Sequence, residues 1–275
     1  MFERLRPGKG TTILWVRKGY ADSLLAAGIC RPGRLLVDHP IRLPGRGPVA
    51  ILPLPGRKGE EAILKRYRRG GLAGKILPHL FLGTARFRRE ISTAETAIRK
   101  GIPVPFPLAL VRKGRWGLYR VFGVTRRIPH TRNVQEIVDA SLSPTRPKDF
   151  IDSIARTIHG MHERGMTHAD LNLGNLLVST AGKGPPVYIV DLVGARLGSA
   201  LTAVQQLKGL RRLRRSWEKS CFFREVLPGS EIGRFLSIYC GSDRELLAVL
   251  RGTGAMDRIL ARTRRLGWWL ARLRR

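Results

Sequence analysis

The residues of this chain best suited to chemistry lie close together in the sequence, between His168 and Asp191. Positions 168–175 read HADLNLGN, and two short apolar runs separate them from Asp191. A carboxylate at Asp170 could orient an attacking hydroxyl and accept its proton. Asn175 and Asp191 offer amide and carboxylate oxygens, the ligands that hold Mg²⁺ on nucleotide phosphates. These residue types in this order indicate phosphoryl transfer.

Each of these residues also has a structural alternative. A single His-x-Asp is common, and an aspartate after a strand usually caps a turn or a helix. The joint pattern is much harder to obtain by chance, because it joins His-x-Asp-Leu-x-x-x-Asn to two strands that end at Asp191. We expect His168 to brace the loop by hydrogen bonding, since one base, Asp170, suffices for the reaction.

Neighbouring elements must position these groups. Residues 176–178 and 187–190 read as two strands around a turn, which would bring Asp191 back beside the loop. Apolar residues recur at helical spacing over 148–164, so we expect a helix before the loop.

Upstream, the pattern is strand-like. The expected strands cover 48–52, 62–67, 108–112 and 116–121. A helix is expected over 84–100, ended by Gly101, whereas residues 11–38 give no readable pattern. Strands followed by helices indicate an α+β protein with two lobes.

The segment from His168 to Asn175 resembles the protein-kinase catalytic loop H-R-D-L-x-x-x-N, with Ala169 in place of the arginine. The DLVG run from Asp191 to Gly194 resembles D-F-G with one extra residue. These departures fit the lipopolysaccharide kinases of Gram-negative bacteria, most of all the 3-deoxy-D-manno-octulosonic acid (Kdo) kinases. The closer match rests on LKRYRRGGL at 64–72, GIPVP at 101–105 and residues 168–177, within a resemblance that covers about 45–215.

The resemblance implies a two-lobed protein-kinase-like fold of the α+β class. Residues 1–124 would form the N-terminal lobe, a small antiparallel sheet with one long helix that binds the nucleotide. Residues 125–275 would form a mainly helical C-terminal lobe with the catalytic loop, the metal site and basic C-terminal helices. The role of residues 1–40 stays open.

The same resemblance implies ATP and Mg²⁺ as cofactors, with Asp170 as the catalytic residue and Asn175 and Asp191 as metal ligands. Lys65 matches the lysine that neutralises the α- and β-phosphates. A glutamate on the following helix should pair with this lysine. Glu90 is the best candidate and Glu95 the alternative, because the sequence does not fix the helix register.

Glycines offer a second nucleotide contact. Gly45 and Gly47 lie in the run GRGPVA, where a loop between strands would cover the phosphates, although Pro48 removes one backbone donor. Arg68 and Arg69, followed by two glycines, suit an anionic ligand that could be nucleotide or acceptor.

The charge of the chain is far from balanced, with 51 Lys and Arg against 20 Asp and Glu and a formal net charge of +31. Such a surface favours polyanions, whether nucleic acid, anionic lipid or phosphorylated sugar. The scattered Cys30, Cys221 and Cys240 favour a reducing compartment over a disulfide framework or a zinc site. We find no secretory signal and no membrane-spanning run, so we expect a cytoplasmic protein.

Two later segments concentrate the charge. Residues 207–219 should form a helix with its apolar side in the core and some arginines towards the acceptor. Residues 258–275 interleave arginines with Trp268 and Trp269, a composition that fits the inner leaflet as well as it fits a solvated helix. The family resemblance implies Kdo–lipid A as the acceptor, at the cytoplasmic face of the inner membrane. We predict neither a nucleic-acid partner nor a protein partner.

Three functions remain open at this point. The chain could be a Kdo–lipid A kinase, a kinase for another acceptor such as a core heptose or a protein Ser/Thr, or a pseudokinase that binds RNA or anionic membrane. The joint presence of Lys65, Asp170, Asn175 and Asp191 argues against the pseudokinase, because a scaffold needs none of them. Aromatic residues are not interleaved at stacking positions, which argues against single-stranded RNA.

Overall fold

A computed structural model of the chain describes residues 2–7, 12–38, 40–41, 48–69, 77–114, 116–140, 148–179, 186–223, 231–244 and 246–248. The chain divides into two compact units. The first consists of Met1–Arg99 and Val104–Pro129, and the second of Lys100–Pro103 and His130–Arg275. The boundary predicted from the sequence lies between residues 124 and 125.

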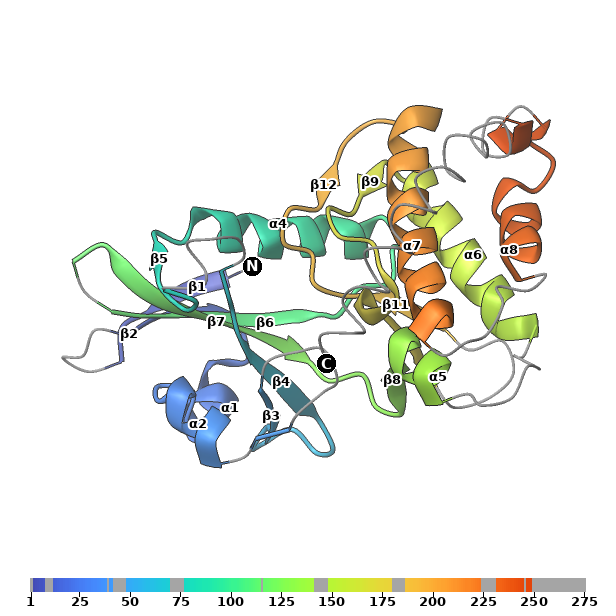
Figure 1. Ribbon diagram of the computed structural model, residues 1–275. Coiled ribbons are helices and arrows are strands. Elements are labelled where there is room, and N and C mark those ends of the chain that lie inside the picture. Colours follow the sequence, from blue (N-terminus) through green and yellow to red (C-terminus); the bar gives the residue numbers. More distant parts are fainter. Residues whose placement is uncertain are drawn as a thin grey trace. The chain divides into compact units, whose positions relative to one another are not determined.

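An antiparallel sheet forms the frame of the first unit (Figure 1). Its strands run in the order β1-β2-β6-β7-β4-β3, and β5 pairs with β7. The strands are β1 (Phe2–Leu5), β2 (Thr12–Arg17), β3 (Val49–Pro53), β4 (Glu61–Arg66), β5 (Phe81–Leu82), β6 (Pro107–Lys113) and β7 (Leu118–Arg126). The four strands predicted from the sequence are confirmed as β3, β4, β6 and β7.

Alternation along β4 sends its side chains to opposite faces of the sheet. Leu64 is buried in the main core of this unit. Lys65 points the other way, to the face covered by α4 (Ala85–Arg99), where it pairs with Glu90. This helix confirms the predicted one and buries Phe87, which packs against Tyr67 with ring centroids 4.4 Å apart.

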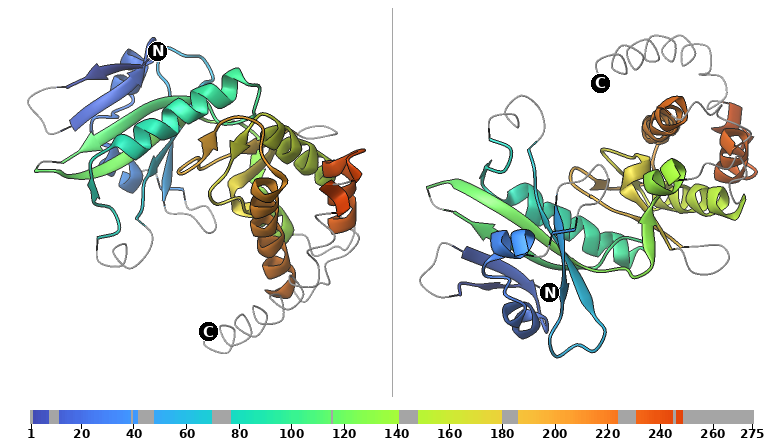
Figure 2. Two further views of the ribbon diagram at one scale, coloured as in Figure 1. Left: turned by 90° about the horizontal axis from the view of Figure 1, so that it is seen from above. Right: turned by 60° about the horizontal axis from the view of Figure 1, so that its bottom comes forward.

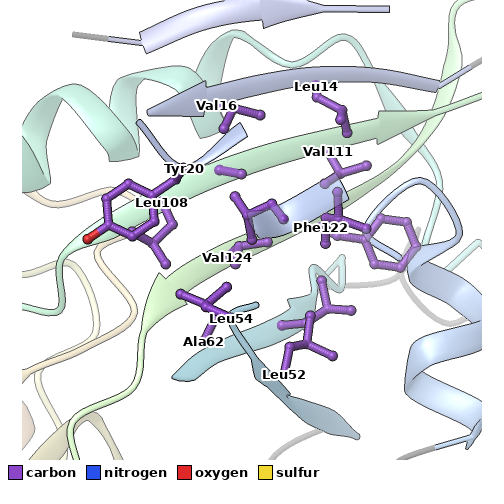
Figure 3. Packing of buried hydrophobic residues seen from close by; sticks show 14 of the residues in the cluster. Leu14, Val16, Tyr20, Leu52, Leu54, Ala62, Leu108, Val111, Phe122 and Val124 are labelled. Atoms are coloured by element: carbon purple, nitrogen blue, oxygen red, sulfur yellow. The ribbon is translucent and has the colours of Figure 1, made fainter. Parts of the chain in front are cut away.

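Two short helices cover the opposite face, α1 (Ala21–Ala26) and α2 (Pro32–Asp38) (Figure 2). Leu24 of α1 and Leu36 of α2 are buried in the main core together with side chains of the sheet. The sheet contributes apolar side chains from β2, β3, β4, β6 and β7 to this core, among them Leu14, Val16, Leu52, Ala62, Leu108, Val111, Phe122 and Val124 (Figure 3). The segment that gave no readable pattern therefore completes the core of the first unit.

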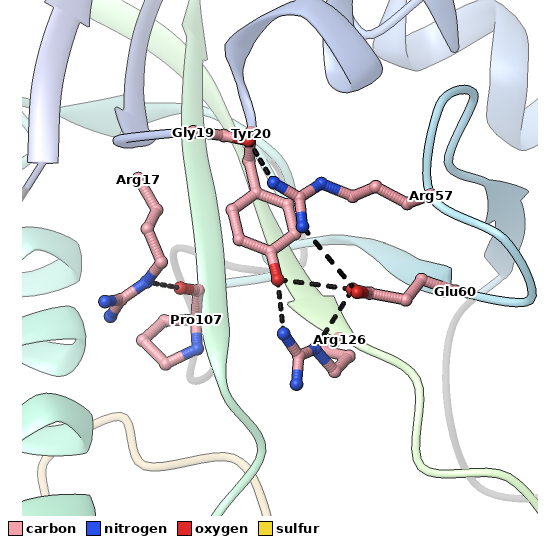
Figure 4. Close-up of polar contacts among 7 residues, drawn as sticks. All are labelled: Arg17, Gly19, Tyr20, Arg57, Glu60, Pro107 and Arg126. Atoms are coloured by element: carbon pink, nitrogen blue, oxygen red, sulfur yellow. Dashed lines mark hydrogen bonds and ion pairs between the residues drawn. The ribbon is translucent and has the colours of Figure 1, made fainter.

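A polar cluster around Tyr20 fastens α1 to the sheet (Figure 4). The guanidinium of Arg57 lies 3.6 Å from the centroid of the Tyr20 ring and donates to the carbonyl of Gly19. The Tyr20 hydroxyl donates to Glu60 Oε2 at 3.2 Å and accepts from Arg126. Glu60 also pairs with both arginines, at 3.6 Å to Arg57 Nη1 and 3.4 Å to Arg126 Nε. One carboxylate therefore serves two guanidinium groups.

The second unit is mainly helical. Its helices are α5 (Val134–Ala140), α6 (Lys148–Glu163), α7 (Ala203–Phe223) and α8 (Glu231–Cys240). Its strands are β8 (Thr131–Asn133), β9 (Met166–Thr167), β10 (Leu176–Ser179), β11 (Val187–Ile189) and β12 (Arg196–Leu197). Strands β11, β10 and β8 form one small antiparallel sheet, and β12 pairs with β9. The predicted helix over 148–164 and the strands around 176–190 are confirmed, as is the α+β class.

Helix α7 bears out the pattern read at 207–219. Leu210, Leu213 and Trp217 are buried at helical spacing, while Lys208 and Arg215 are exposed. None of the helices in the described part of the chain has an apolar stretch long enough to cross a bilayer.

Two polar contacts join α6 to the other helices of this unit. Asp152 of α6 receives two hydrogen bonds from Arg234 of α8, at 2.6 and 2.8 Å, and these bonds lower the pKa of Asp152. His162 Nδ1 lies 2.7 Å from the hydroxyl of Tyr239, which donates to Gln206 Oε1 of α7 at 2.8 Å. Burial lowers the pKa of His162 to about 4, with the charge of His159 adding to the shift.

The shifted pKa of His162 predicts a loss of stability in mild acid. The unfolded chain binds a proton at this residue near pH 6.5, whereas the folded chain does so only near pH 4, so acid favours unfolding. Between pH 7 and pH 5 this group should lower the free energy of unfolding by about 2 kcal/mol. Urea titrations across this range should show that His162→Gln loses that part of the slope. Parallel pH profiles for the two proteins would contradict the prediction.

Candidate active site

The first unit holds a lysine–glutamate pair on the α4 face of its sheet. Lys65 Nζ, on β4, lies 3.4 Å from Glu90 Oε1 on α4. The hydroxyl of Tyr67 donates to Glu90 Oε2 at 2.6 Å, and the Lys65 ammonium lies 4.8 Å from the centroid of the Tyr67 ring. The Glu90 side chain is 11% exposed and that of Lys65 29% exposed, so the carboxylate holds the ammonium at the edge of the solvent.

Glu95, the alternative partner, has a different role in the structure. It accepts a hydrogen bond from Arg17 Nη2 of β2 at 2.9 Å. Arg17 also donates to the carbonyl of Pro107 at 2.9 Å and lies 4.0 Å from the centroid of the Phe106 ring. Glu90 and Glu95 differ by about 140° around the helix axis, so the rotation of α4 decides which of them meets Lys65.

In the second unit, His168 holds the loop of residues 168–175 by both ring nitrogens. Its Nδ1 accepts the backbone N–H of Asp170 at 3.1 Å, and its Nε2 lies 3.1 Å from the carbonyl of Val190. The first contact makes Nδ1 an acceptor, so Nε2 carries the proton and donates to Val190. Burial lowers the pKa of His168, against the opposing effect of its hydrogen bond to Val190 and of the charges of Asp191 and Asp170. The imidazole is therefore neutral and fully hydrogen-bonded, as expected for a bracing residue.

Asn175 closes the other end of the loop. It ends the 3₁₀ turn Leu173–Asn175, and its side chain is buried. Its Nδ2 donates to the backbone carbonyl of Asp170 at 2.9 Å, and its own carbonyl accepts the N–H of Val190 at 2.9 Å. The amide is thereby oriented, and Oδ1 is the atom of this side chain that could bind a cation.

Strand β11 carries the chain to Asp191. Its register against β10 pairs Leu176 with Ile189, and the N–H of Ile189 donates to the carbonyl of Pro103 at 2.8 Å. Pro103 lies in the GIPVP passage that contributed to the family resemblance, which gives that passage a structural role. Since Val190 is bonded to both His168 and Asn175, the residue that follows it is held beside the loop.

The backbone at Asp191 is unusual, with φ = 62°. A left-handed conformation is uncommon outside glycine, costs on the order of 1 kcal/mol or more, and is concentrated at functional sites. Gly194, at φ = 81°, continues the turn, and a Cβ built there would lie 3.0 Å from the Cβ of Ala169. The small residue in place of the kinase arginine therefore contacts the DLVG turn directly.

The oxygen atoms of Asn175 and Asp191 fit a hard divalent cation such as Mg²⁺. Within the described residues, three or more His, Cys, Asp and Glu side chains nowhere gather as a possible metal site. Two protein ligands nevertheless fit Mg²⁺, which usually keeps several waters and takes its remaining ligands from substrate phosphates.

Helix α7 contacts the loop of residues 168–175, a feature that was not predicted in detail from the sequence. The N–H of Leu173 donates to Ser216 Oγ at 3.3 Å. Arg212 Nη1 lies 3.8 Å from Oδ1 of Asp170. The signal available in the sequence was the spacing of Gly209, Arg212 and Ser216, which share one side of a helix.

Asp170 itself is accessible, with 71% of its side chain exposed. Its backbone is fixed by His168 and Asn175, while its carboxylate faces solvent. Gly45, Gly47 and the basic segment 258–275 lie outside the described residues, as do Gly70 and Gly71 after the arginine pair.

Several known proteins are similar to this chain in sequence or fold. The model of the lipopolysaccharide kinase (Kdo/WaaP) family matches residues 56–239. A 3-deoxy-D-manno-octulosonic acid kinase of Haemophilus influenzae (strain PittEE) is 30% identical over 181 residues, 64% of this chain and 73% of the relative. The enzyme of the same description from Vibrio parahaemolyticus is 33% identical over 171 residues, 60% of this chain and 68% of the relative.

Among solved structures, WaaP in complex with acyl carrier protein has a similar fold. The TM-score is 0.58 at 17% sequence identity, covering 93% of this chain and 99% of that one. This likeness supports the protein-kinase-like fold. With a family model that spans most of the chain and relatives of about one-third identity, the chain belongs to the lipopolysaccharide kinase (Kdo/WaaP) family.

Proposed function

We propose that this protein transfers the γ-phosphoryl group of ATP to a hydroxyl of Kdo in Kdo–lipid A, during synthesis of the lipopolysaccharide core. Its family makes it a phosphotransferase that acts on a hydroxyl. The choice of Kdo rests on one observation, the run of relatives described as 3-deoxy-D-manno-octulosonic acid kinases at 28–33% identity. The surplus of positive charge suits this acceptor, a sugar acid on an anionic lipid.

Asp170 would receive the acceptor. Its exposed carboxylate can accept a hydrogen bond from the attacking hydroxyl, orient the oxygen lone pair and take the proton as the new O–P bond forms. His168 is not available for this step, because one nitrogen accepts from the loop backbone and the other donates to Val190. Asp170 is the residue whose backbone is fixed and whose carboxylate is accessible, so the proton is assigned to it.

Lys65 would bind the nucleotide phosphates. Glu90 holds the ammonium by charge and is itself held by the Tyr67 hydroxyl, so the cation is oriented before ATP binds. Asn175 and Asp191 would hold Mg²⁺, which when bound neutralises charge on the phosphates. Gly45 and Gly47 remain candidates for the loop over these phosphates, on sequence grounds alone.

A membrane-anchored acceptor would place the enzyme at the cytoplasmic face of the inner membrane. The net charge of +31 supports this location, because the inner leaflet is anionic and each nearby Lys or Arg contributes about 1 kcal/mol of attraction. The tryptophans and arginines of 258–275 would supply the contact.

Labelled ATP tests the acceptor directly. Purified full-length protein should transfer label to Kdo–lipid A, and should leave lipid A without Kdo and a generic protein substrate unlabelled. The reason is that the proposed nucleophile is a hydroxyl of Kdo. Label in the protein substrate, or in a core carrying heptose alone, would support a kinase for another acceptor. Absence of transfer to any acceptor, with ATP bound, would favour a pseudokinase.

Replacement of the proposed base should strongly reduce turnover while leaving ATP binding and stability nearly unchanged. Asp170→Asn should lower kcat roughly 10²- to 10⁴-fold, because the amide cannot accept the proton. Affinity for ATP, measured with a fluorescent nucleotide, and the unfolding temperature should stay close to those of the wild type. Asp22→Asn, which removes an exposed carboxylate of α1, serves as the control and should keep full activity. Full activity in Asp170→Asn would contradict the assignment of Asp170 as the base.

Variants of Glu90 and Glu95, both on α4, distinguish an effect on nucleotide binding from an effect on stability. Glu90→Gln should reduce kcat/KM for ATP roughly 10- to 100-fold, since Lys65 loses a charged partner. Glu95→Gln removes a carboxylate that contacts Arg17 instead, so kcat/KM for ATP should stay near that of the wild type. Unfolding temperatures of both variants report any loss of packing. Equal kinetic effects of the two changes would argue against a specific role for Glu90.

A further inference from the structure

Arg212 stands next to the proposed catalytic carboxylate. Its Nη1 lies 3.8 Å from Oδ1 of Asp170, with 47% of the arginine side chain and 71% of the aspartate side chain exposed. This separation is too long for a hydrogen bond, and exposed ion pairs contribute little to stability. The pair therefore does little to hold the fold together, and both groups remain available to a substrate.

The position of Arg212 is nevertheless well defined by α7. The buried Leu210 and Leu213 anchor this part of the helix. On its loop side, a Cβ built at Gly209 would lie 3.5 Å from Leu171, and Ser216 accepts the N–H of Leu173. Arg212 lies between Gly209 and Ser216 in the helix. Because both of these residues pack against the loop, the guanidinium of Arg212 lies beside the loop as well.

Other arginines of this unit have carboxylate partners that are clearly structural. Arg214 pairs with Glu218 on the same helix at 2.8 Å, and Arg234 binds Asp152 with two hydrogen bonds. Among the residues that the structure describes, the carboxylate that faces Arg212 is Asp170, the group that must instead receive a hydroxyl. A bound acceptor would take Asp170 away from this pair.

We propose that Arg212 binds the carboxylate of the sugar-acid acceptor and thereby selects that acceptor. The inference rests on the proposed function and deepens it. A guanidinium presents a planar fork of donors that matches a carboxylate. An octulosonic acid carries its carboxylate and its hydroxyls on one small frame, so a cation near the base can hold the first while the base receives the second. The Arg212–Asp170 ion pair is then exchanged for two interactions with the substrate.

This arrangement discriminates against neutral sugars. A sugar without the carboxylate would leave Arg212 beside Asp170, where its charge competes with the acceptor hydroxyl for the same oxygen. Sites built for a polar group reject analogues that lack it far better than apolar pockets reject an extra methylene. Arg212 is in this sense a specificity-determining residue, whereas Asp170 is the catalytic one.

A cycle that changes the enzyme and the acceptor separately tests the proposal. The enzymes are the wild type, Arg212→Gln, Arg212→Lys and the control Arg211→Gln. Arg211 carries the same charge on the same helix but is turned about 100° further from the loop. The acceptors are Kdo–lipid A and the same lipid with the Kdo carboxylate as its methyl ester. Acceptor kcat/KM, KM for ATP and unfolding temperature are measured for each enzyme.

The wild type and Arg211→Gln should lose roughly 10- to 100-fold in acceptor kcat/KM with the ester, as expected for one charged hydrogen-bonding contact. Arg212→Gln should show that loss already with the free acid and almost no further loss with the ester. Arg212→Lys should recover part of the activity, because it keeps the charge and loses the fork. KM for ATP should not change.

Two failures can be told apart. In the first, the wild type phosphorylates Kdo–lipid A, but the methyl ester lowers acceptor kcat/KM by the same factor in Arg212→Gln and in the wild type. The two changes are then independent, so this inference is wrong while the proposed function stands. If the wild type transfers no phosphate to Kdo–lipid A, the proposed function fails and takes the inference with it. A loss in Arg212→Gln that appears equally in KM for ATP would also overturn it, because the effect would not be specific to the acceptor.

Discussion

The geometry of the segment from His168 to Asp191 depends on one buried imidazole. His168 accepts from the backbone of Asp170 and donates to the carbonyl of Val190, the residue before Asp191. It therefore joins a carboxylate that would receive a hydroxyl to a carboxylate that would hold a metal ion, although the two are far apart in sequence. The contact with the N–H of Asp170 requires a neutral ring, and burial keeps the ring neutral by lowering its pKa. A cationic imidazole could not accept the N–H that fixes the loop.

The surrounding elements place that ring and leave little freedom to the residues it connects. Strands β10 and β11 are in register, the carbonyl of Asn175 accepts from Val190, and the side chain of Asn175 returns to the carbonyl of Asp170. Helix α7 supports the loop from another side through Ser216. Fixed backbone combined with an exposed carboxylate is what positioning requires, because the catalytic group must be held without being covered. The left-handed Asp191 is tolerated in that setting.

Much of this arrangement could be predicted from the sequence, because it is local. Strands β3, β4, β6, β7, β10 and β11 and helices α4 and α6 follow from periodicity and turn residues. The short helices α1 and α2 could not be read, since six or seven residues give too few turns for a helical period to stand out. The choice of Glu90 over Glu95 depended on the rotation of α4, which is set by the packing of Phe87 against Tyr67 and Phe81. Arg212 beside Asp170 depends on tertiary packing of α7, about which spacing alone says little.

The sharing of carboxylates has a consequence for how the protein tolerates mutation. Glu60 serves Arg57 and Arg126, and Asp152 serves Arg156 and Arg234, in a chain with 51 basic and 20 acidic side chains. Loss of one of these arginines leaves its carboxylate with a second partner. Loss of the acid leaves two guanidinium groups facing each other, with few other anions in the chain to take its place. Substitution of one of these arginines should therefore reduce the stability of the folded state less than substitution of the acidic residue that it shares.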